Sequence, residues 1–377
     1  MRKAGNTIRV TAQLIRADNG YHLWSKTYDR DFKDIFKIQD EIAAAVVEAL
    51  KAKLLPTQEI SSRHKTSNTE AYTQYLLGNQ FRSSDTVASN HEAQAAYQKA
   101  VALDPGYAAA YAGLSNAEWR IADQSTGEAA AYQRAAAAAD KAITLAPDSP
   151  EGYWARGQLR VNYLFDWIGA QGDYERALAL DPHFAWALVG EGRLLATLGR
   201  MPEAIVTMRR AIALDPLSAK AWGGLAALLM NGGQLPAARD AFRRLSEIDS
   251  QVDTIDGIGT VELLGGHIHQ ALTLYQEGRT DLRYIGLAMA EHTLGHAAES
   301  QRALEFVEHK YSNVWAYQIA EIHAWRGESD KAFEWLERAY RQHDGGLTYL
   351  SYDPFMKNLR GDARYKALRL KLKLPDV

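Results

Sequence analysis

Hydrophobic and polar residues alternate along the first thirty positions of the chain. In the run IRVTAQL, residues 8–14, Ile, Val, Ala and Leu take alternate positions, and Arg, Thr and Gln take the positions between them. The turn-forming residues Asp18, Asn19 and Gly20 follow, and a second β-rich run contains Trp24 and Tyr28. A period of two interrupted by residues that tolerate positive φ predicts a β-hairpin.

The pattern then changes to a helical period. The run DIFKIQDEIAAAVVEALKAKLL, residues 34–55, spaces its apolar residues for one amphipathic helix that ends at Pro56. Residues 57–69 are polar, lack periodicity and are predicted to be a linker. Residues 1–56 therefore form a β-β-α segment. Because an isolated hairpin is marginally stable in water, we expect its edge to be covered by a dimer partner, by the helix at 38–55, or by another chain.

From residue 70 onward the helical pattern repeats. AVALDP begins at 100, AITLAP at 142, ALALDP at 177 and AIALDP at 211, so the prolines lie 42, 35 and 34 residues apart. The helix before each proline carries a small, a large and a small residue at steps of four and three, such as Ala170, Tyr174 and Ala177. Small residues let neighbouring helices approach closely, and the large one fills the gap between them. A period near 34 predicts a helix-turn-helix solenoid.

This pattern of small and large residues resembles that of the tetratricopeptide repeat family. The resemblance implies a mainly α fold, a right-handed α-solenoid of about eight helix pairs over residues 70–346. Residues 347–377 do not follow the repeat, and their basic helix is expected to cap the last apolar face. The cations of this stretch leave a second interpretation open, in which they attract nucleic acid or an anionic membrane.

The N-terminal segment is similar to the last part of the TolB-like domain of bacterial multidomain regulators. In those proteins a winged-helix DNA-binding domain, a class III nucleotide cyclase or a kinase domain precedes it, and a repeat array follows. The resemblance implies that residues 1–56 are a partial TolB-like domain. It rests on Val10, Ala12, Gln13, Leu14, Gly20, Leu23, Trp24, Tyr28, Asp29, Arg30, Phe36, Gln39, Asp40, Glu41 and Ile42.

Composition narrows the classes of function. The 377 residues carry a formal charge of −3 and no cysteine, so thiol catalysis and thiolate metal sites are excluded. With a pI near 6.4 we expect no nucleic-acid binding by this chain itself. No apolar stretch is long enough to span a membrane. We therefore expect a cytoplasmic protein, or one on the periplasmic face of the inner membrane if the chain belongs to a longer anchored protein.

Catalytic motifs are missing from the sequence. No phosphate-binding glycine loop and no nucleophile elbow occurs, so the chain is predicted not to be an enzyme and to need no cofactor. Two pairs of histidines offer an alternative, a metal-dependent site. Both pairs border predicted turns, where solvated histidines are common. We therefore expect no metal ligands among them. The four residues are His267, His269, His292 and His296.

A row of amide, arginine and aromatic side chains supplies the candidate binding surface. In the register of the resembled family, these side chains face the concave groove of the solenoid. Amides can pair with the backbone of an extended peptide, arginine with a carboxylate, and aromatic rings with apolar side chains. The alternative is that Trp119, Trp154 and Trp186 pack between repeats. The row consists of Tyr75, Asn79, Arg82, Asn116, Trp119, Arg120, Trp154, Gln158, Asn162, Trp186 and Arg193.

These features predict a non-catalytic scaffold that binds a peptide or protein in the groove, as part of a bacterial signalling or transcription-regulatory protein. Tyr75 and Trp154 occupy positions where chaperone-binding relatives carry lysine, so chaperone tails are not expected as ligands. A homodimer formed through the hairpin is a further predicted association. The alternative function is the effector-less portion of a transcription regulator or nucleotide cyclase whose activity lies in an upstream domain.

Overall fold

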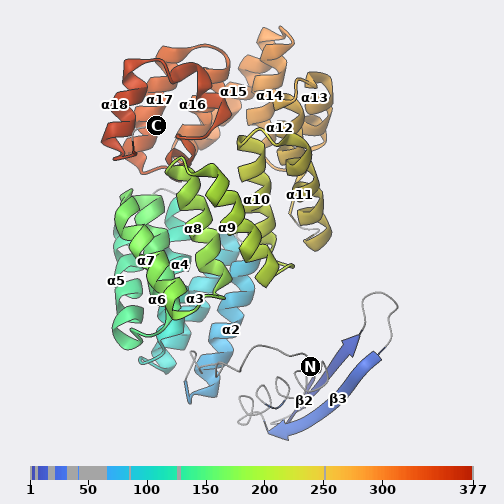
Figure 1. The fold of residues 1–377 in the computed structure, drawn as a ribbon, viewed down its shortest axis with the longest axis vertical. Helices are drawn as coiled ribbons and strands as arrows, with labels where there is room; N and C mark the ends of the chain where they lie inside the picture. The colour runs from blue at the N-terminus through green and yellow to red at the C-terminus, as the bar shows by residue number, and fades with distance from the viewer. Residues whose placement is uncertain are drawn as a thin grey trace.

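A computed structural model describes residues 2–4, 7–15, 22–31, 41, 66–84, 86–124, 129–249 and 252–375 (Figure 1). Within these ranges a small antiparallel sheet precedes a long array of helices. The helix predicted over 34–55, apart from Glu41, and most of the predicted linker lie outside the described residues.

The sheet confirms the predicted hairpin and adds one strand to it. β2 (Thr7–Ile15) pairs with β3 (His22–Asp31), and β1 (Arg2–Ala4) pairs with the first residues of β2. The short, polar strand β1 has no hydrophobic alternation, and for that reason the sequence did not reveal it. Its pairing covers part of the β2 edge.

The two faces of the sheet differ as the alternation predicts. On one face an exposed ion pair joins Arg9 to Asp29 at 2.7 Å. On the other face Val10 lies opposite Tyr28, and Tyr28 is buried against Ala71 of α2 and Tyr107, just before α4. The start of the array therefore packs against the hairpin at Tyr28, a contact that the sequence did not suggest.

The described part of the array contains eight helix-turn-helix pairs, which form an α-solenoid. They are α2 (Thr69–Ser84) with α3 (Val87–Leu103), α4 (Ala108–Gln124) with α5 (Ala129–Leu145), α6 (Pro150–Leu159) with α7 (Trp167–Leu180), α8 (Ala185–Thr197) with α9 (Met201–Leu214), α10 (Ala219–Asn231) with α11 (Leu235–Ile248), α12 (Ile255–Leu264) with α13 (Ile268–Glu277), α14 (Arg283–Thr293) with α15 (Ala297–Tyr311), and α16 (Ala316–Trp325) with α17 (Ser329–Gln342).

One large side chain in the second helix of a pair fills the space between two first helices. Tyr174 of α7 lies where a Cβ on Gly157 of α6 or on Gly190 of α8 would stand 2.7 Å from its ring. Tyr97 occupies the same place between Gly78 and Gly113. The glycines are therefore required by close packing of the repeats.

The C-terminal segment returns to the third helix pair (Figure 1). A π-helical turn, η2 (Arg160–Leu164), extends α6, and its Tyr163 carbonyl accepts a hydrogen bond from Nδ1 of His343 at 2.8 Å. The indole N–H of Trp167 donates to the carbonyl of Leu372 at 2.7 Å. The solenoid thus winds far enough for its last unit to pack on its third. The segments after α17 are η3 (Gly345–Tyr349), η4 (Pro354–Leu359) and α18 (Ala363–Lys371).

The basic C-terminal helix is paired within the protein. Arg364 lies 2.8 Å from Asp330, and Lys371 lies 2.6 Å from Glu337. On its other side α18 buries Tyr365 and Leu368 in a shared hydrophobic core. The apolar side of α18 thus packs on the protein, and two of its cations pair with α17. Among the described helices, none has the length and apolar character needed to cross a membrane.

Candidate binding site on the concave face

Two neighbouring cavities lie on the concave face, between the first helices of the repeats. The tryptophan hollow, of about 180 Å³, is lined by Tyr75, Asn79, Arg82, Ala109, Ala112, Gly113, Glu151, Trp154, Phe184 and Trp186. The closure cavity, of about 250 Å³, is bordered by α4, α6, η2 and α8 on one side and by the C-terminal segments on the other. Its lining includes Trp119, Arg120, Asp123, Gln124, Gln158, Asn162, Arg193, Thr197, Gln318, Asp344, Thr348, Tyr349 and Tyr352.

The structure divides the predicted row between these cavities. Tyr75, Asn79, Arg82, Trp154 and Trp186 line the tryptophan hollow, and Trp119, Arg120, Gln158, Asn162 and Arg193 line the closure cavity.

Asn116 lines neither cavity. Asn116 is 7% exposed, because α4 packs against α3, α5 and α6 on several sides. Trp119 and Trp154 are each 5% exposed, so the alternative that tryptophans pack between repeats describes most of their surface. Both residues nevertheless line a cavity, Trp119 the closure cavity and Trp154 the tryptophan hollow.

The tryptophan hollow centres on Arg82 from α2. Its guanidinium carbon lies 4.7 Å from the ring centroid of Trp186 and 5.4 Å from that of Trp154. The two indoles are 5.8 Å apart, and Phe184 stands perpendicular to Trp154. No carboxylate pairs with Arg82 among the described residues. A stacked guanidinium keeps its charge and its edge-on N–H donors available to an anion.

A buried tyrosine outside the lining holds the Asn79 amide of this hollow in place. The hydroxyl of Tyr97 donates to Oδ1 of Asn79 at 2.7 Å and fixes the orientation of the amide. Burial raises the pKa of Tyr97 to about 12, so this hydroxyl stays protonated at neutral pH. Burial also raises the pKa of Tyr75, whose ring lies 6.1 Å from that of Tyr97.

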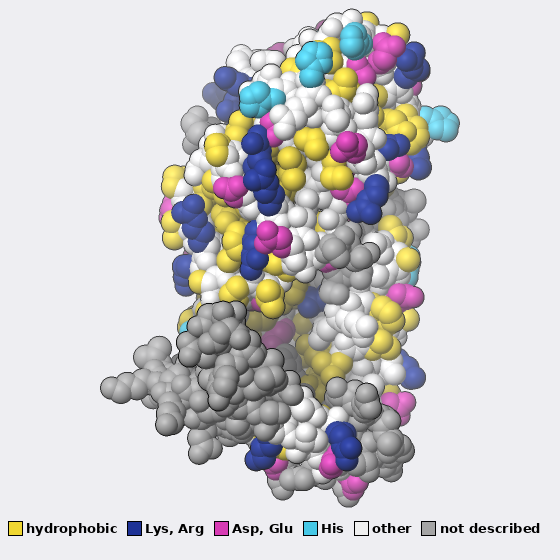
Figure 2. All heavy atoms as spheres, turned by 90° about the vertical axis from the view of Figure 1, so that its right-hand side faces the viewer, with side chains coloured by type: hydrophobic (Ala, Val, Ile, Leu, Met, Phe, Trp, Pro, Cys, Tyr) yellow, Lys and Arg dark blue, Asp and Glu magenta, His cyan; other side chains and the backbone are white. Residues whose placement is uncertain are grey.

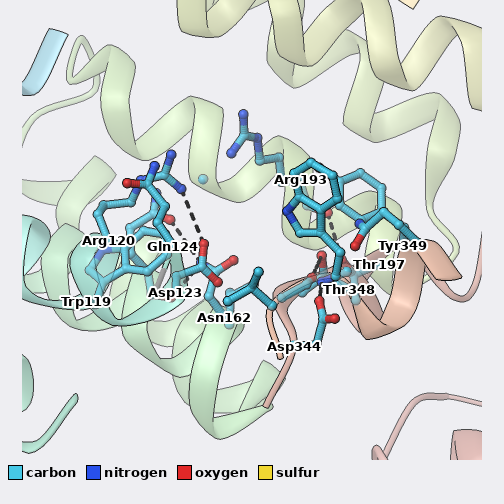
Figure 3. Close-up of a pocket in the computed structure, with 18 of the residues that line it drawn as sticks. Trp119, Arg120, Asp123, Gln124, Asn162, Arg193, Thr197, Asp344, Thr348 and Tyr349 are labelled. Atoms are coloured by element: carbon cyan, nitrogen blue, oxygen red, sulfur yellow. Dashed lines mark hydrogen bonds and ion pairs between the residues drawn. The ribbon is translucent and has the colours of Figure 1, made fainter. Parts of the chain in front are cut away.

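One wall of the closure cavity comes from α4 and α6 (Figure 3). Arg120 lies 3.8 Å from Asp123 and stacks over the ring of Trp119 at 5.0 Å. The π-helical turn η2 carries Asn162, whose amide N–H donates to the Gln158 carbonyl at 2.8 Å. A π turn shifts the helical phase, and such turns are frequent at functional sites. This wall is therefore rich in groups that can both donate and accept hydrogen bonds.

Two further charged residues line the cavity from different elements. Arg193 comes from α8, and its side chain is exposed. Asp344, just before η3, accepts hydrogen bonds from the backbone N–H groups of Tyr317 at 2.9 Å and Gly346 at 2.8 Å. Burial raises the pKa of Asp344 to about 6, and the charge of Asp123 adds to the shift. The carboxyl is therefore ionised at pH 7.5.

A pair of acids lies behind the closure cavity and does not line it. Asp353 is buried and accepts hydrogen bonds from the Tyr317 hydroxyl at 2.8 Å and the Phe355 N–H at 2.7 Å. Burial and the neighbouring charge of Asp353 raise the pKa of Glu321 well above its usual range. Two such carboxyl groups share a proton, but they have no access to a substrate in either cavity.

Of the four candidate histidines, His267 and His296 lie in repeat turns, whereas His269 lies in α13 and His292 in the last turn of α14. Nδ1 of His267 lies 2.9 Å from Glu262, and Nδ1 of His296 lies 2.7 Å from Glu291, each pair spanning the turn of its own repeat. The histidines on the face shown in Figure 2 are separated from one another. In the part of the chain that the structure describes, no group of three or more potential ligands is placed to hold a metal ion.

Several lining residues escaped the sequence analysis. Phe184 and Glu151 lie near the starts of α8 and α6, close to residues that the register did select. Gln318, Asp344 and Tyr349 come from the eighth repeat and the segment after it. No local pattern marks them, because their position depends on how far the whole solenoid winds.

Comparison with known proteins identifies the repeats. Residues 166–215 and 199–254 each match a model of the tetratricopeptide repeat. These matches include α7 to α11, where the predicted small-large-small register is most regular. The repeats within residues 166–254 are therefore tetratricopeptide repeats.

The chain is also similar to a curated relative and to solved structures, each over part of its length. The putative adenylate cyclase 3 of Rhizobium meliloti (strain 1021) is 39% identical over 117 residues, which are 30% of this chain and 20% of that protein. The chain thus spans about a fifth of the length of the curated relative it matches. A tetratricopeptide repeat protein from Parabacteroides merdae is 17% identical, with a TM-score of 0.47 over 68% of this chain and 99% of its own. Pseudomonas aeruginosa pilF is 15% identical, with a TM-score of 0.43 over 57% and 97%. Neither structural likeness is close enough to support an argument about function.

Proposed function

We propose that this protein is a non-catalytic scaffold that docks an extended segment of a partner protein in the tryptophan hollow. The supporting observation is Arg82, a cation that stacks on Trp154 and Trp186 and has no carboxylate partner among the described residues. Tetratricopeptide solenoids expose such first-helix side chains on a concave face, where a partner segment can reach several repeats at once.

The chemistry of the hollow favours a segment with a carboxylate beside an apolar side chain. The carboxylate would pair with the guanidinium of Arg82, and the apolar group would contact Phe184 and the edges of the indoles. Tryptophan and arginine are the residues that most often dominate interface energies. Asn79 and Tyr75 supply a polar rim that can bind the backbone of the segment.

Selection from a displayed peptide library on the full chain tests this proposal. We expect selected peptides to carry Asp or Glu next to an apolar residue, and Arg82→Gln to weaken their binding about 30-fold, the loss of a typical hot spot. Arg176→Gln is the matched control, because Arg176 stacks on Tyr153 of α6 and lines neither cavity. Peptides that bind wild type and Arg82→Gln equally would place the docking site elsewhere.

A second candidate function rests on the cyclase relative. The matched stretch covers a fifth of a protein named for cyclase activity, so this chain can correspond to a regulatory segment whose effector lies in another domain. The resemblance of residues 1–56 to a partial TolB-like domain supports the same assignment to bacterial signalling or transcription regulation. In that arrangement the solenoid binds a partner, and the effector carries out the chemistry.

An activity assay separates this candidate from a catalytic one. We expect the purified chain to form no cyclic AMP from ATP with Mg²⁺ or Mn²⁺, because neither described cavity combines a phosphate-binding loop with metal ligands. Formation of cyclic AMP that rises with protein concentration would contradict the scaffold assignment.

A further inference from the structure

The acidic side chains that line the two concave cavities have partners within the protein. Asp123 lies 3.8 Å from Arg120, and Asp344 accepts hydrogen bonds from two backbone N–H groups. The carboxylate of Glu151 accepts a hydrogen bond from the hydroxyl of Ser149. These acids therefore have their charge partly compensated before any ligand arrives.

Two arginines in the same cavities have no such compensation. Among the described residues, no carboxylate and no other acceptor binds the guanidinium of Arg82, which stacks on Trp154 and Trp186, or that of Arg193. The side chain of Arg193 is exposed, and Figure 3 shows its guanidinium pointing away from Asp344. Each arginine can therefore donate two parallel hydrogen bonds to a carboxylate without first breaking an ion pair.

The first helices α6 and α8 each run from one cavity into the other. On α8, Trp186 lines the tryptophan hollow, and Gly190 and Arg193 line the closure cavity. On α6, Trp154 lines the hollow, and Gln158, one turn later, lines the closure cavity. Steps of three and four keep these residues on one face of each helix. The two cavities are therefore successive parts of one groove, and Gly190 places no side chain between them on α8.

The rise of α8 sets the distance between the two cations. Arg82 stacks 4.7 Å from the ring centroid of Trp186, so Trp186 marks the place of the first guanidinium. Arg193 follows Trp186 by two helical turns, which amounts to about 10.5 Å along the helix axis. An extended chain advances about 3.3 Å per residue, so three or four residues of a bound segment cover this distance.

We propose that the groove binds two acidic side chains of one partner segment, three or four residues apart, the first at Arg82 and the second at Arg193. This inference rests on the proposed docking of a partner segment and adds the charge pattern of that segment. The first acid lies beside the apolar side chain that contacts Phe184. The second lies in the closure cavity, where the amides of Gln158 and Asn162 can bind the backbone of the segment. Arg193 then determines specificity, because it strengthens binding only of segments that carry the second acid.

Selection of short random peptides on the full chain is the first test. We expect the selected peptides to carry two Asp or Glu residues three or four positions apart, one of them next to an apolar residue. The same selection on Arg193→Gln should retain the acid with its apolar neighbour and lose the other acid. If peptides selected on the wild type carry a single acid, the inference is overturned, whereas docking at Arg82 still stands.

A double-mutant cycle measures the second contact. The probes are the tightest selected peptide, amidated at its C-terminus so that only side chains supply carboxylates, and its analogue with the second acid replaced by the corresponding amide. Arg193→Gln should weaken binding of the two-acid peptide about tenfold, as expected for the loss of one hydrogen-bonded charge pair, and should leave binding of the analogue unchanged.

Controls separate this inference from the docking proposal on which it rests. Arg176→Gln should change the binding of neither peptide. If Arg193→Gln weakens both peptides equally, or neither, then Arg193 does not bind the second acid and the inference is wrong. If no peptide is selected, or if the selected peptides bind Arg82→Gln as tightly as wild type, the docking proposal fails and the two-acid pattern fails with it.

Discussion

At the scale of single residues, a pair of buried carboxyl groups outside both cavities makes the stability of the fold depend on pH. Glu321 and Asp353 face each other beside the Tyr317 hydroxyl, and burial raises the pKa of both. The folded chain therefore holds a proton that the unfolded chain releases once the pH exceeds the ordinary pKa of glutamate. Stability falls with rising pH wherever the folded state binds more protons, so this pair destabilises the protein at neutral and alkaline pH.

Glu321→Gln should remove that penalty, because an amide cannot ionise. We expect its urea midpoint to exceed that of wild type at pH 8.5 and to differ much less at pH 4.5, where the folded and unfolded wild-type chains differ less in bound protons. Glu334→Gln, on the exposed face of α17, is the control and should show no such difference between the two pH values. A wild-type advantage at pH 8.5 would mean that Glu321 is ionised and stabilising.

At the scale of elements, one large side chain per pair sets the spacing of the first helices. Tyr97 fits only because Gly113 of α4 lacks a side chain, since a Cβ there would stand 2.5 Å from the ring. The same fit recurs at Tyr174 and Tyr275, each between two glycines. The spacing between first helices determines how wide the concave cavities are.

Gly113→Ala should therefore destabilise the protein by about 1 to 3 kcal/mol through overpacking. Gly172→Ala is the matched control, because Gly172 lies inside α7 with nothing within 4 Å of its added Cβ. That substitution should be neutral or stabilise by about 0.5 to 1 kcal/mol, the usual gain of alanine over glycine in a helix. Thermal unfolding of both variants measures the contrast, and equal effects would argue against the packing role of Tyr97.

The sequence predicted the repeats because their register is local. The steps that join Ala170, Tyr174 and Ala177 lie within two helical turns, and they recur at a nearly constant period. Likewise, alternation predicted the two faces of the hairpin at Val10 and Arg9. Ten of the eleven predicted groove residues line a cavity, and all ten come from the first helices of the first four pairs or from the turn η2 that extends one of them.

The remaining features depend on distant parts of the chain. The hydrogen bond between His343 and Tyr163 joins residues 180 apart, and that between Trp167 and Leu372 joins residues 205 apart. These contacts follow from small rotations summed over many repeats, and no short motif encodes such a sum. The sequence therefore did not predict that Asp344 would line the same cavity as Arg193.

At the scale of the whole molecule, the return of the C-terminal segment to the third helix pair is the central feature. Phe165, in the left-handed conformation at φ 49°, ends η2 and stacks with Tyr340 and His343. Trp167 shares a core with Leu336 and Leu372. This contact converts one end of an open groove into the closure cavity, and so it decides which ligands the concave face can admit.

A disulfide cross-link measures this closure directly, because the chain has no cysteine of its own. A Cβ on Gly345 would lie 3.1 Å from a carboxylate oxygen of Asp123, so Asp123→Cys with Gly345→Cys places two thiols within bonding range. Gly172→Cys with Gly345→Cys is the control pair. We predict that mild oxidation joins the first pair within one chain and leaves the control pair reduced. Equal cross-linking of the two pairs, or none in either, would contradict the closure.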